Sequence, residues 1–272
     1  MPELLPTDSE LQQFVAGAFP LSLDLNTLNR CNASCIMCPF AVKYDDLGEQ
    51  LPPYYRLTLE EYKRISAGLR IHSAHFVGAY AEPLMNKELF QLVAYAKAHG
   101  TQTAVTSNGT LLSRQFAEKL IDAGLDLLTI SLHGATKATA ERIMRGADFD
   151  QVLENMRTLR QVKAEKRVNN PLVQINFVGQ RLNIEELPQF VSLAASLDIR
   201  IIHFVHLLDG AKEVDASSSL VHYPELLTRN VKQALDVARR EGVTLYVSSA
   251  YQAVIDALDG AGGGTSRAEE AA

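Results

Sequence analysis

The chain has 272 residues, of which 26 are basic and 32 are acidic, so its formal net charge at pH 7 is −6. Hydrophobic residues make up 47% of the sequence and charged residues 21%, which excludes a disordered acidic chain and allows a sizeable core. No apolar run approaches the roughly 18 residues of a membrane-spanning helix, and the first ten residues lack a basic start and an apolar h-region. We therefore expect a globular cytoplasmic protein, not attached to a membrane, whose thiols are reduced.

Apolar runs of strand length alternate with helical patterns along most of the chain. The expected strands are residues 21–28, 75–79, 101–107, 126–132, 172–178 and 200–207. The expected helices are residues 58–69 with Thr58 as N-cap, 87–99, 113–123, 149–166, 184–197 and 223–241. Six β-then-α units predict a parallel sheet, because parallel strands need crossover connections and helices are the usual crossovers.

The two ends of the chain are expected to lie outside this alternating core. We expect a lead-in helix in residues 1–19, a core barrel in residues 20–208, and a closing helix with a short strand in residues 209–259. The strand, residues 243–248, has an uncertain pairing. Residues 260–272 are rich in glycine and predict a flexible tail.

Several expected strands are polar on one face and apolar on the other. The polar residues are Ser22, Asp24, Asn26, Thr129, Ser131, His133, Gln174 and Asn176. Buried parallel strands are ordinarily apolar on both faces, so a polar face indicates that this side of the sheet lines a space accessible to water. This pattern favours an α/β fold in which a parallel sheet curves into an incomplete (β/α)6 barrel with a polar concavity. The alternative is an open doubly wound sheet with polar residues at its strand ends.

All three cysteines of the chain, Cys31, Cys35 and Cys38, lie within eight residues just after the first strand. They cannot all pair as disulfides within one chain, and sites in parallel βα folds assemble at the carboxyl ends of strands. Three thiolates from one loop suit a soft metal centre such as an iron–sulfur cluster. In a [4Fe-4S] cluster they would leave one iron open to another ligand. A zinc site with a histidine as fourth ligand is the alternative.

The spacing Cys-x3-Cys-x2-Cys after a first barrel strand resembles the signature of the radical SAM superfamily. The resemblance implies that S-adenosyl-L-methionine binds the open iron through its amino and carboxylate groups. It also implies that the reduced cluster cleaves this cofactor to a 5′-deoxyadenosyl radical, which abstracts hydrogen from a substrate. An electron donor such as flavodoxin or ferredoxin is then the expected redox partner.

Residues 78–85 resemble the Gly-x-Gly-Glu-Pro-Leu segment of this family, with Ala81 where the second glycine is usual. The resemblance implies that Gly78, Ala81, Glu82 and Pro83 surround the methionyl amino group of S-adenosylmethionine.

Three later segments also resemble motifs of the family, and they follow in the family's order. Residues 106–110 are similar to a Thr-Asn-Gly turn, and residues 131–134 to a Ser-Leu-Asp-Gly pattern in which His133 replaces the acid. The resemblance implies that Asn108 and Ser131 contact the ribose or the methionyl carboxylate. Arg145 begins a segment similar to the family's Arg-Gly and Phe-Asp stretch, where an arginine could meet that carboxylate.

Polar side chains beside the cofactor are the candidates for substrate contact. They are Asp24, Asn26, His133, Gln174, Asn176 and His206. His203 and His206 face opposite ways on one strand, and His206 is preferred because it lies nearer the carboxyl end.

We expect a radical SAM enzyme with a single cluster, because no cysteine follows Cys38. Its expected substrate is a small metabolite or natural-product intermediate. One alternative is a peptide-modifying radical SAM enzyme that works with a partner, and another is a non-catalytic zinc-binding or scaffold protein. The basic residues of 149–167 are interrupted by glutamates and predict a solvated helix face, so nucleic-acid binding is not expected.

Overall fold

A computed structural model of the chain describes residues 21–38, 53–78, 81–208, 214 and 216–263. One sheet contains seven strands in the order β1 (Leu21–Asn26), β3 (Ile71–Val77), β4 (Gln102–Ser107), β5 (Leu127–Ser131), β7 (Leu172–Gly179), β8 (Ile201–His206) and β9 (Thr244–Val247). A second, two-stranded sheet pairs β2 (Ser34–Cys35) with β6 (Met144–Arg145). The expected lead-in helix, residues 1–19, lies outside the described residues.

The helices follow the strands in the expected alternation. They are α3 (Leu59–Ser66), α4 (Leu89–Ala98), α5 (Arg114–Asp122), α6 (Lys137–Ile143), α7 (Phe149–Lys166), α8 (Leu187–Ser196), α9 (Pro224–Glu241) and α10 (Ser249–Gly263). Short 3-10 turns are η2 (Pro83–Met85), η3 (Ile184–Glu186), η4 (Ala216–Ser218) and η5 (Leu220–His222). Within the described ranges, every helix is too short or too polar to span a bilayer.

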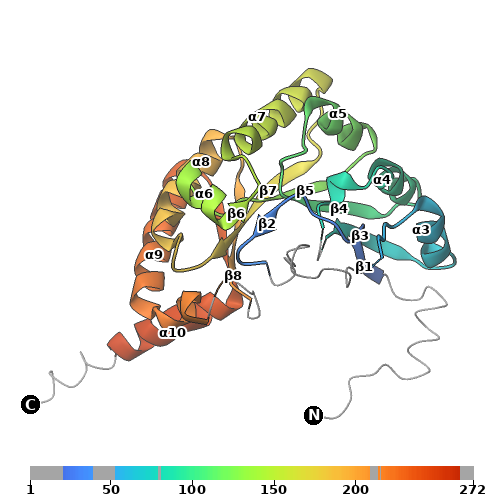
Figure 1. The fold of residues 1–272 in the computed structure, drawn as a ribbon. Coiled ribbons are helices and arrows are strands. Elements are labelled where there is room, and N and C mark those ends of the chain that lie inside the picture. The colour runs from blue at the N-terminus through green and yellow to red at the C-terminus, as the bar shows by residue number, and fades with distance from the viewer. Residues whose placement is uncertain (1–20, 39–52, 79–80, 209–213, 215, 264–272) are drawn as a thin grey trace, which may run out of the picture.

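The order of the strands across the large sheet is their order along the chain, and every neighbouring pair is parallel. A doubly wound sheet reverses its direction at a switch point, and this sheet does not. Because right-handed crossovers in one direction place their helices on one side, the helices line the outer, convex side of a curved sheet (Figure 1). The predicted incomplete barrel is confirmed, and the doubly wound alternative is wrong.

The short strand expected at residues 243–248, whose pairing was uncertain, is the seventh strand of the sheet, β9. β9 pairs in parallel with β8, with Phe204 opposite Val247. Within the described sheet, β1 and β9 each have one neighbour, so the barrel is open between them. The helix α10 that follows has 15 residues and runs past residue 260, where the tail was expected to begin.

Local sequence signals fix where the helices begin and end. Thr58 is the N-cap of α3 as predicted: its hydroxyl accepts from the Glu61 backbone N–H, and the Glu61 carboxylate accepts from the Thr58 N–H. Gly242 ends α9 with a φ of +66°, a left-handed conformation that favours glycine. The short helix α6 was not predicted, because its seven residues give little periodicity.

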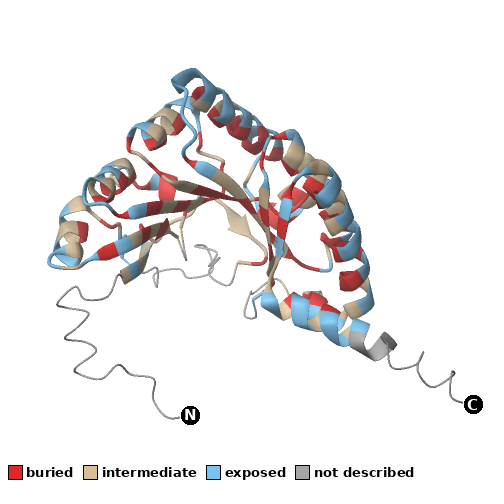
Figure 2. Ribbon diagram, turned by 180° about the vertical axis from the view of Figure 1, so that it is seen from behind, coloured by how far each residue is buried: buried red, intermediate tan, exposed pale blue. Residues whose placement is uncertain are grey.

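The core lies between the sheet and the helices. Figure 2 shows buried residues on the sheet and on the helix faces that pack against it, with exposed residues on the outer helix faces. Aromatic rings fill this layer: the ring centroids of Phe177 and Phe190 are 4.6 Å apart, and those of Tyr62 and Phe76 are 5.7 Å apart. Such edge-on contacts add to the stabilisation from buried apolar area.

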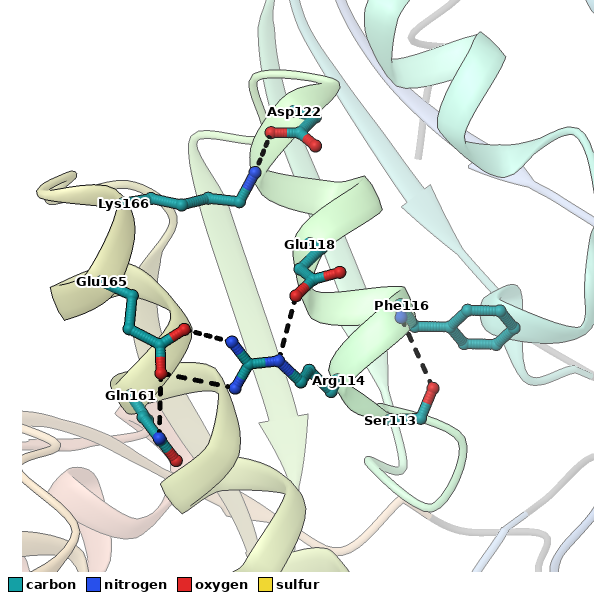
Figure 3. A network of polar contacts seen from close by, with 8 residues as sticks. All are labelled: Ser113, Arg114, Phe116, Glu118, Asp122, Gln161, Glu165 and Lys166. Atoms are coloured by element: carbon teal, nitrogen blue, oxygen red, sulfur yellow. Dashed lines mark hydrogen bonds and ion pairs between the residues drawn. The ribbon is translucent and has the colours of Figure 1, made fainter.

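Ion pairs join α5 and α7 on the solvent side of this layer (Figure 3). Arg114 pairs with Glu118 on its own helix and with Glu165 on α7, and Lys166 pairs with Asp122 at 2.5 Å. Exposed ion pairs contribute little to stability. The two helices are therefore held mainly by the apolar residues beneath these pairs.

The helix α10 closes one end of the sheet through a buried tyrosine. The hydroxyl of Tyr251 donates to the Gly179 carbonyl at 2.6 Å and accepts from the Leu207 N–H at 3.2 Å. Burial raises the pKa of this hydroxyl to about 12, so it stays protonated. The contact links α10 to the carboxyl ends of β7 and β8.

Removing this hydroxyl should destabilise the protein. We expect Tyr251→Phe to lower the free energy of unfolding by about 1–3 kcal/mol, because it leaves a buried carbonyl and a buried N–H without partners. Thr228→Val is the matched control, since the buried Thr228 hydroxyl has no hydrogen-bond partner in the described part of the chain; it should leave stability unchanged or raise it. Urea titrations of both variants make the comparison, and equal midpoints would contradict the role given to Tyr251.

Candidate functional site

The three cysteines lie on one loop that leaves the carboxyl end of β1. All three thiols are free and half-buried. The loop is fixed by a short antiparallel pairing in which Cys35 lies opposite Met144, and by a hydrogen bond of 2.9 Å from the Ile36 N–H to the Ile143 carbonyl. The expected sulfur ligands are therefore brought together on a loop that the α6–β6 segment holds in place.

A glycine makes this pairing possible. Gly146 follows β6 with a φ of +85°, and a Cβ there would lie 3.2 Å from the Asn32 carbonyl oxygen. The preceding Arg145 lies in register with Ser34 and has an exposed side chain. Arg145 is thus brought beside the cysteine loop, and its contact with a carboxylate stays a prediction.

The surroundings of the thiols disfavour the thiolate in the metal-free protein. Burial raises the pKa of Cys35 to about 12 and also raises the pKa of Cys31, and the neighbouring thiols act in the same direction. The Ala33 N–H, 3.4 Å from the Cys31 sulfur, has the opposite effect. Because iron and zinc bind thiolates, metal binding at this loop must release protons.

The donor atoms on this loop are three thiols. Among the described residues, no three Cys, His, Asp or Glu side chains are grouped so that they could hold one metal ion. A zinc site needs all its sulfur ligands at about 2.3 Å from one ion. An iron–sulfur cluster instead binds each cysteine to a different iron. Three thiols on one loop are the donor set of such a cluster, whereas a zinc ion would need a fourth ligand.

The second motif forms a tight turn at the end of β3. A Cβ on Gly78 would lie 2.2 Å from the Ala81 carbonyl oxygen, so only glycine fits there. Glu82 follows as the N-cap of η2, and its carboxylate accepts from the Leu84 N–H at 3.0 Å. Pro83 begins the 3-10 turn. Residues 79 and 80 lie outside the described residues, and they include the end of the strand expected at 75–79.

Glu82 is buried and connects three parts of the site. Its carboxylate also accepts from the Ser107 hydroxyl and the Asn108 N–H, each at 2.7 Å, and its own N–H donates to the Arg30 carbonyl at 3.0 Å. Burial raises the pKa of the carboxyl, and its three hydrogen bonds act in the opposite direction. Glu82 thus holds the end of β4 and the residue before Cys31.

Asn108 and Ser131 were expected to contact the ribose or the methionyl carboxylate, and they differ in whether their side chains are already hydrogen-bonded. The Asn108 side chain donates to Asn32 and accepts from Thr110, so its amide is directed at the cysteine loop. Ser131 is half-buried at the end of β5, and its hydroxyl has no partner in the described part of the chain. Ser131 is therefore free to bind a ligand.

His133 has a structural position. It is 3% exposed, and its Nδ1 accepts from the Val178 N–H at 3.1 Å, while its carbonyl accepts from Asn183. Burial lowers its pKa to about 4, so the ring is neutral. The chain leaves the sheet after Ser131 and turns His133 into the protein, which removes it from the candidates for substrate contact.

The register of the strands decides which polar residues share the concave face. Asp24 lies opposite His75, and Asn176 lies between Ser131 and His203, so these side chains project to one side of the sheet. Gln174, two residues before Asn176, shares this side, and Asn26 is two residues beyond Asp24 on β1.

The preference for His206 over His203 was wrong. His206 lies opposite Gly179, on the other face, where its ring centroid is 6.2 Å from that of Tyr251. Proximity to the end of a strand was the wrong criterion, because the face depends on the register of the whole sheet.

Two hydrogen-bonded networks cross the concave face, and they include His75, Thr106 and Tyr246, which were not predicted to lie there. His75 Nδ1 is 2.9 Å from an Asp24 carboxylate oxygen, and His75 Nε2 is 2.8 Å from the Thr106 hydroxyl. The expected strand began at His75, whereas β3 begins at Ile71 and contains Ser73 and His75 on this face. Placing the strand four residues earlier would have revealed this alternation.

The second network involves the strands on the other side. Gln174 donates to the Thr129 hydroxyl at 2.9 Å, and its Oε1 is 3.1 Å from His203 Nε2. The ring of Tyr246 on β9 stacks on His203 with centroids 5.1 Å apart. Because the Gln174 Oε1 can only accept, His203 donates from Nε2.

The sequence of the chain is similar to those of known proteins. A family model described as the radical SAM superfamily matches residues 25–194. An Fe-coproporphyrin III synthase from Methanosarcina barkeri is 29% identical over 217 residues, 78% of this chain and 51% of the relative. A PqqA peptide cyclase from Bradyrhizobium diazoefficiens is 29% identical over 194 residues, 70% of this chain and 47% of the relative. The chain spans about half the length of these curated relatives.

A solved structure shares the fold at lower identity. SuiB from Streptococcus suis, bound to the precursor peptide SuiA, superposes with a TM-score of 0.68 and 16% identity, over 89% of this chain and 52% of SuiB.

The buried His133 should make stability depend on pH. Its pKa is about 4 in the folded protein and about 6.5 in the unfolded chain, so its contribution is complete above pH 6.5 and is lost as the pH falls toward 4. His133→Asn keeps an acceptor for the Val178 N–H but does not titrate. Between pH 7 and pH 4.5 we expect the free energy of unfolding of this variant to fall by about 2–3 kcal/mol less than that of the parent. Urea titrations at both pH values test this, and equal losses would contradict it.

Proposed function

Because the chain belongs to the radical SAM superfamily, we propose that it is an enzyme that binds one [4Fe-4S] cluster through Cys31, Cys35 and Cys38 and reductively cleaves S-adenosylmethionine. The family implies both S-adenosylmethionine and an iron–sulfur cluster as cofactors. The observation that carries the proposal is the set of three free thiols on one loop, held at the carboxyl ends of the strands. When bound, these cofactors would supply a 5′-deoxyadenosyl radical that abstracts hydrogen from the substrate.

The residues around the loop support binding of S-adenosylmethionine. The turn from Gly78 through Ala81, Glu82 and Pro83 brings backbone close to the loop. The hydroxyl of Ser131, which has no partner among the described residues, can bind a ribose or carboxylate oxygen. Arg145 lies on the strand that pairs with the cysteine loop, and its guanidinium is complementary to a carboxylate.

The chemistry of the concave face supports a small polar substrate. None of the seven described strands of the sheet contains a lysine or an arginine. The face offers the carboxylate of Asp24 and the neutral hydrogen-bonding groups of Asn176 and His203. These groups suit an uncharged or cationic molecule better than one rich in phosphate. We take a small metabolite or natural-product intermediate as the substrate and a flavodoxin or ferredoxin as the electron donor in the cytoplasm.

A peptide substrate delivered by a partner is the second candidate. The observation that favours it is the opening between β1 and β9, whose outer edges have no neighbouring strand among the described residues. An extended peptide can pair with such an edge. The PqqA peptide cyclase and the SuiB structure with its precursor peptide are similar to this chain over more than two thirds of its length.

Anaerobic reconstitution tests the cofactor assignment. We expect about four irons and four sulfides per chain, with a broad visible absorbance, and reductant-dependent formation of 5′-deoxyadenosine from S-adenosylmethionine. Cys31→Ala, Cys35→Ala and Cys38→Ala should each lose the cluster, because each removes a ligand to a different iron. Thr228→Val, remote from the loop, is the control that keeps it. Stoichiometric zinc without visible absorbance would support a zinc-binding scaffold and overturn the proposal.

Isotope transfer identifies the substrate class. Deuterated small molecules and deuterated peptides are incubated separately with the reconstituted enzyme, and the 5′-deoxyadenosine is analysed by mass spectrometry. Deuterium from a small polar molecule is the expected result, and Asp24→Asn should lower kcat/KM for it by about tenfold, the effect of losing a charged hydrogen bond. Deuterium from peptides alone would favour the second candidate.

A further inference from the structure

Three side chains form a closed ring of hydrogen bonds beside the first cysteine. Asn108 Nδ2 donates to Asn32 Oδ1 at 2.9 Å, Asn32 Nδ2 donates to the Thr110 hydroxyl at 2.7 Å, and that hydroxyl donates to Asn108 Oδ1 at 2.6 Å. Asn32 directly follows Cys31. The ring therefore joins the cysteine loop to the turn after β4.

The Asn108 amide has no hydrogen-bonding capacity left for another ligand. Its Oδ1 has two lone pairs and accepts from both the N–H and the hydroxyl of Thr110. Its Nδ2 has two hydrogens; one reaches Asn32, and the other is directed at the Cys31 sulfur, 4.0 Å away. All four positions are used within the protein.

The turn that carries the ring is itself rigidly held. The Asn108 backbone N–H donates to the buried Glu82 carboxylate. Asn155, on α7 and 5% exposed, donates to the carbonyls of Gly109 and Thr110 at 2.8 and 3.1 Å. Gly109 has a φ of +76°, and a Cβ there would press on Val152 and Ile130 at 3.2 and 3.3 Å. The ring is thus anchored to β3, β4 and α7.

We propose that Asn32, Asn108 and Thr110 act as a clamp that orients Cys31 for iron binding, and that Asn108 is a positioning residue and not a contact of S-adenosylmethionine. The inference deepens the proposed function and rests on it. The clamp holds the Cys31 end of the loop, while β6 holds the Cys35 end. Fixing a metal ligand before the metal arrives lowers the entropy lost on binding.

Alkylation of the metal-free protein tests the clamp without any cofactor. Thr110→Val removes the hydroxyl at constant shape, and Asn32→Ala removes the exposed member of the ring. In both variants iodoacetamide should modify Cys31 about threefold to tenfold faster, as expected for the loss of one or two hydrogen bonds, while Cys38 changes little. Peptide mass spectrometry separates the three cysteines within each sample. Thr110→Ser should restore the parent rate, and Thr228→Val, the matched control, should not change it.

The reconstituted protein gives the second measurement. Thr110→Val and Asn32→Ala should release iron to a chelator several times faster than the parent, and equilibrium dialysis should show an affinity for S-adenosylmethionine within about twofold of the parent. Unchanged Cys31 alkylation in both variants would overturn the clamp. Iron release as slow as that of the parent, together with an affinity for S-adenosylmethionine at least tenfold weaker, would also overturn it. That result would indicate that Asn108 contacts S-adenosylmethionine. If no variant or parent binds a cluster, the proposed function fails, while the alkylation result still decides the clamp.

Discussion

The buried carboxylate of Glu82 is the interaction on which the site depends. A carboxylate that is 1% exposed is tolerated only when its oxygens are satisfied, and Leu84, Ser107 and Asn108 supply the three donors. The same residue donates its N–H to the Arg30 carbonyl, one residue before the first cysteine. The ends of β1, β3 and β4 are consequently fixed relative to one another, and a shift in any one of them would break at least one of these buried hydrogen bonds.

The winding of the sheet explains why its concave face is polar. Crossovers that all run in one direction place the helices on the convex side, so one strand face is packed into the core and the described helices leave the other uncovered (Figure 1). The rule that buried parallel strands are apolar on both faces applies where helices cover both. Here Phe76 and Phe204 face the helices, while His75 and His203, one residue earlier, face the concavity.

The sequence was sufficient for the properties that depend on local chemistry. The alternation of polar and apolar residues, the N-cap at Thr58 and the end of the helix predicted at 223–241 are encoded within a few residues, and the structure confirms them. The choice between His203 and His206, the pairing of His75 with Asp24 and the burial of His133 depend on register and on chain direction after a strand. Register is set by packing between distant segments, so no local pattern in one strand could reveal it.

The two halves of the sheet use their polar residues differently. In β1, β3 and β4 the polar groups mostly bond one another: Asp24 pairs with His75, and Asn108 is saturated by Asn32 and Thr110. In β5, β7 and β8, Gln174 bonds Thr129 and His203 in the same way, but Ser131 and Asn176, nearer the carboxyl ends of their strands, have no side-chain partner among the described residues. Groups that already bond within the protein give rigidity, whereas unpaired half-buried groups gain free energy when a ligand satisfies them. The first half is therefore suited to holding the cysteine loop still, and the second half to recognising what binds beside it.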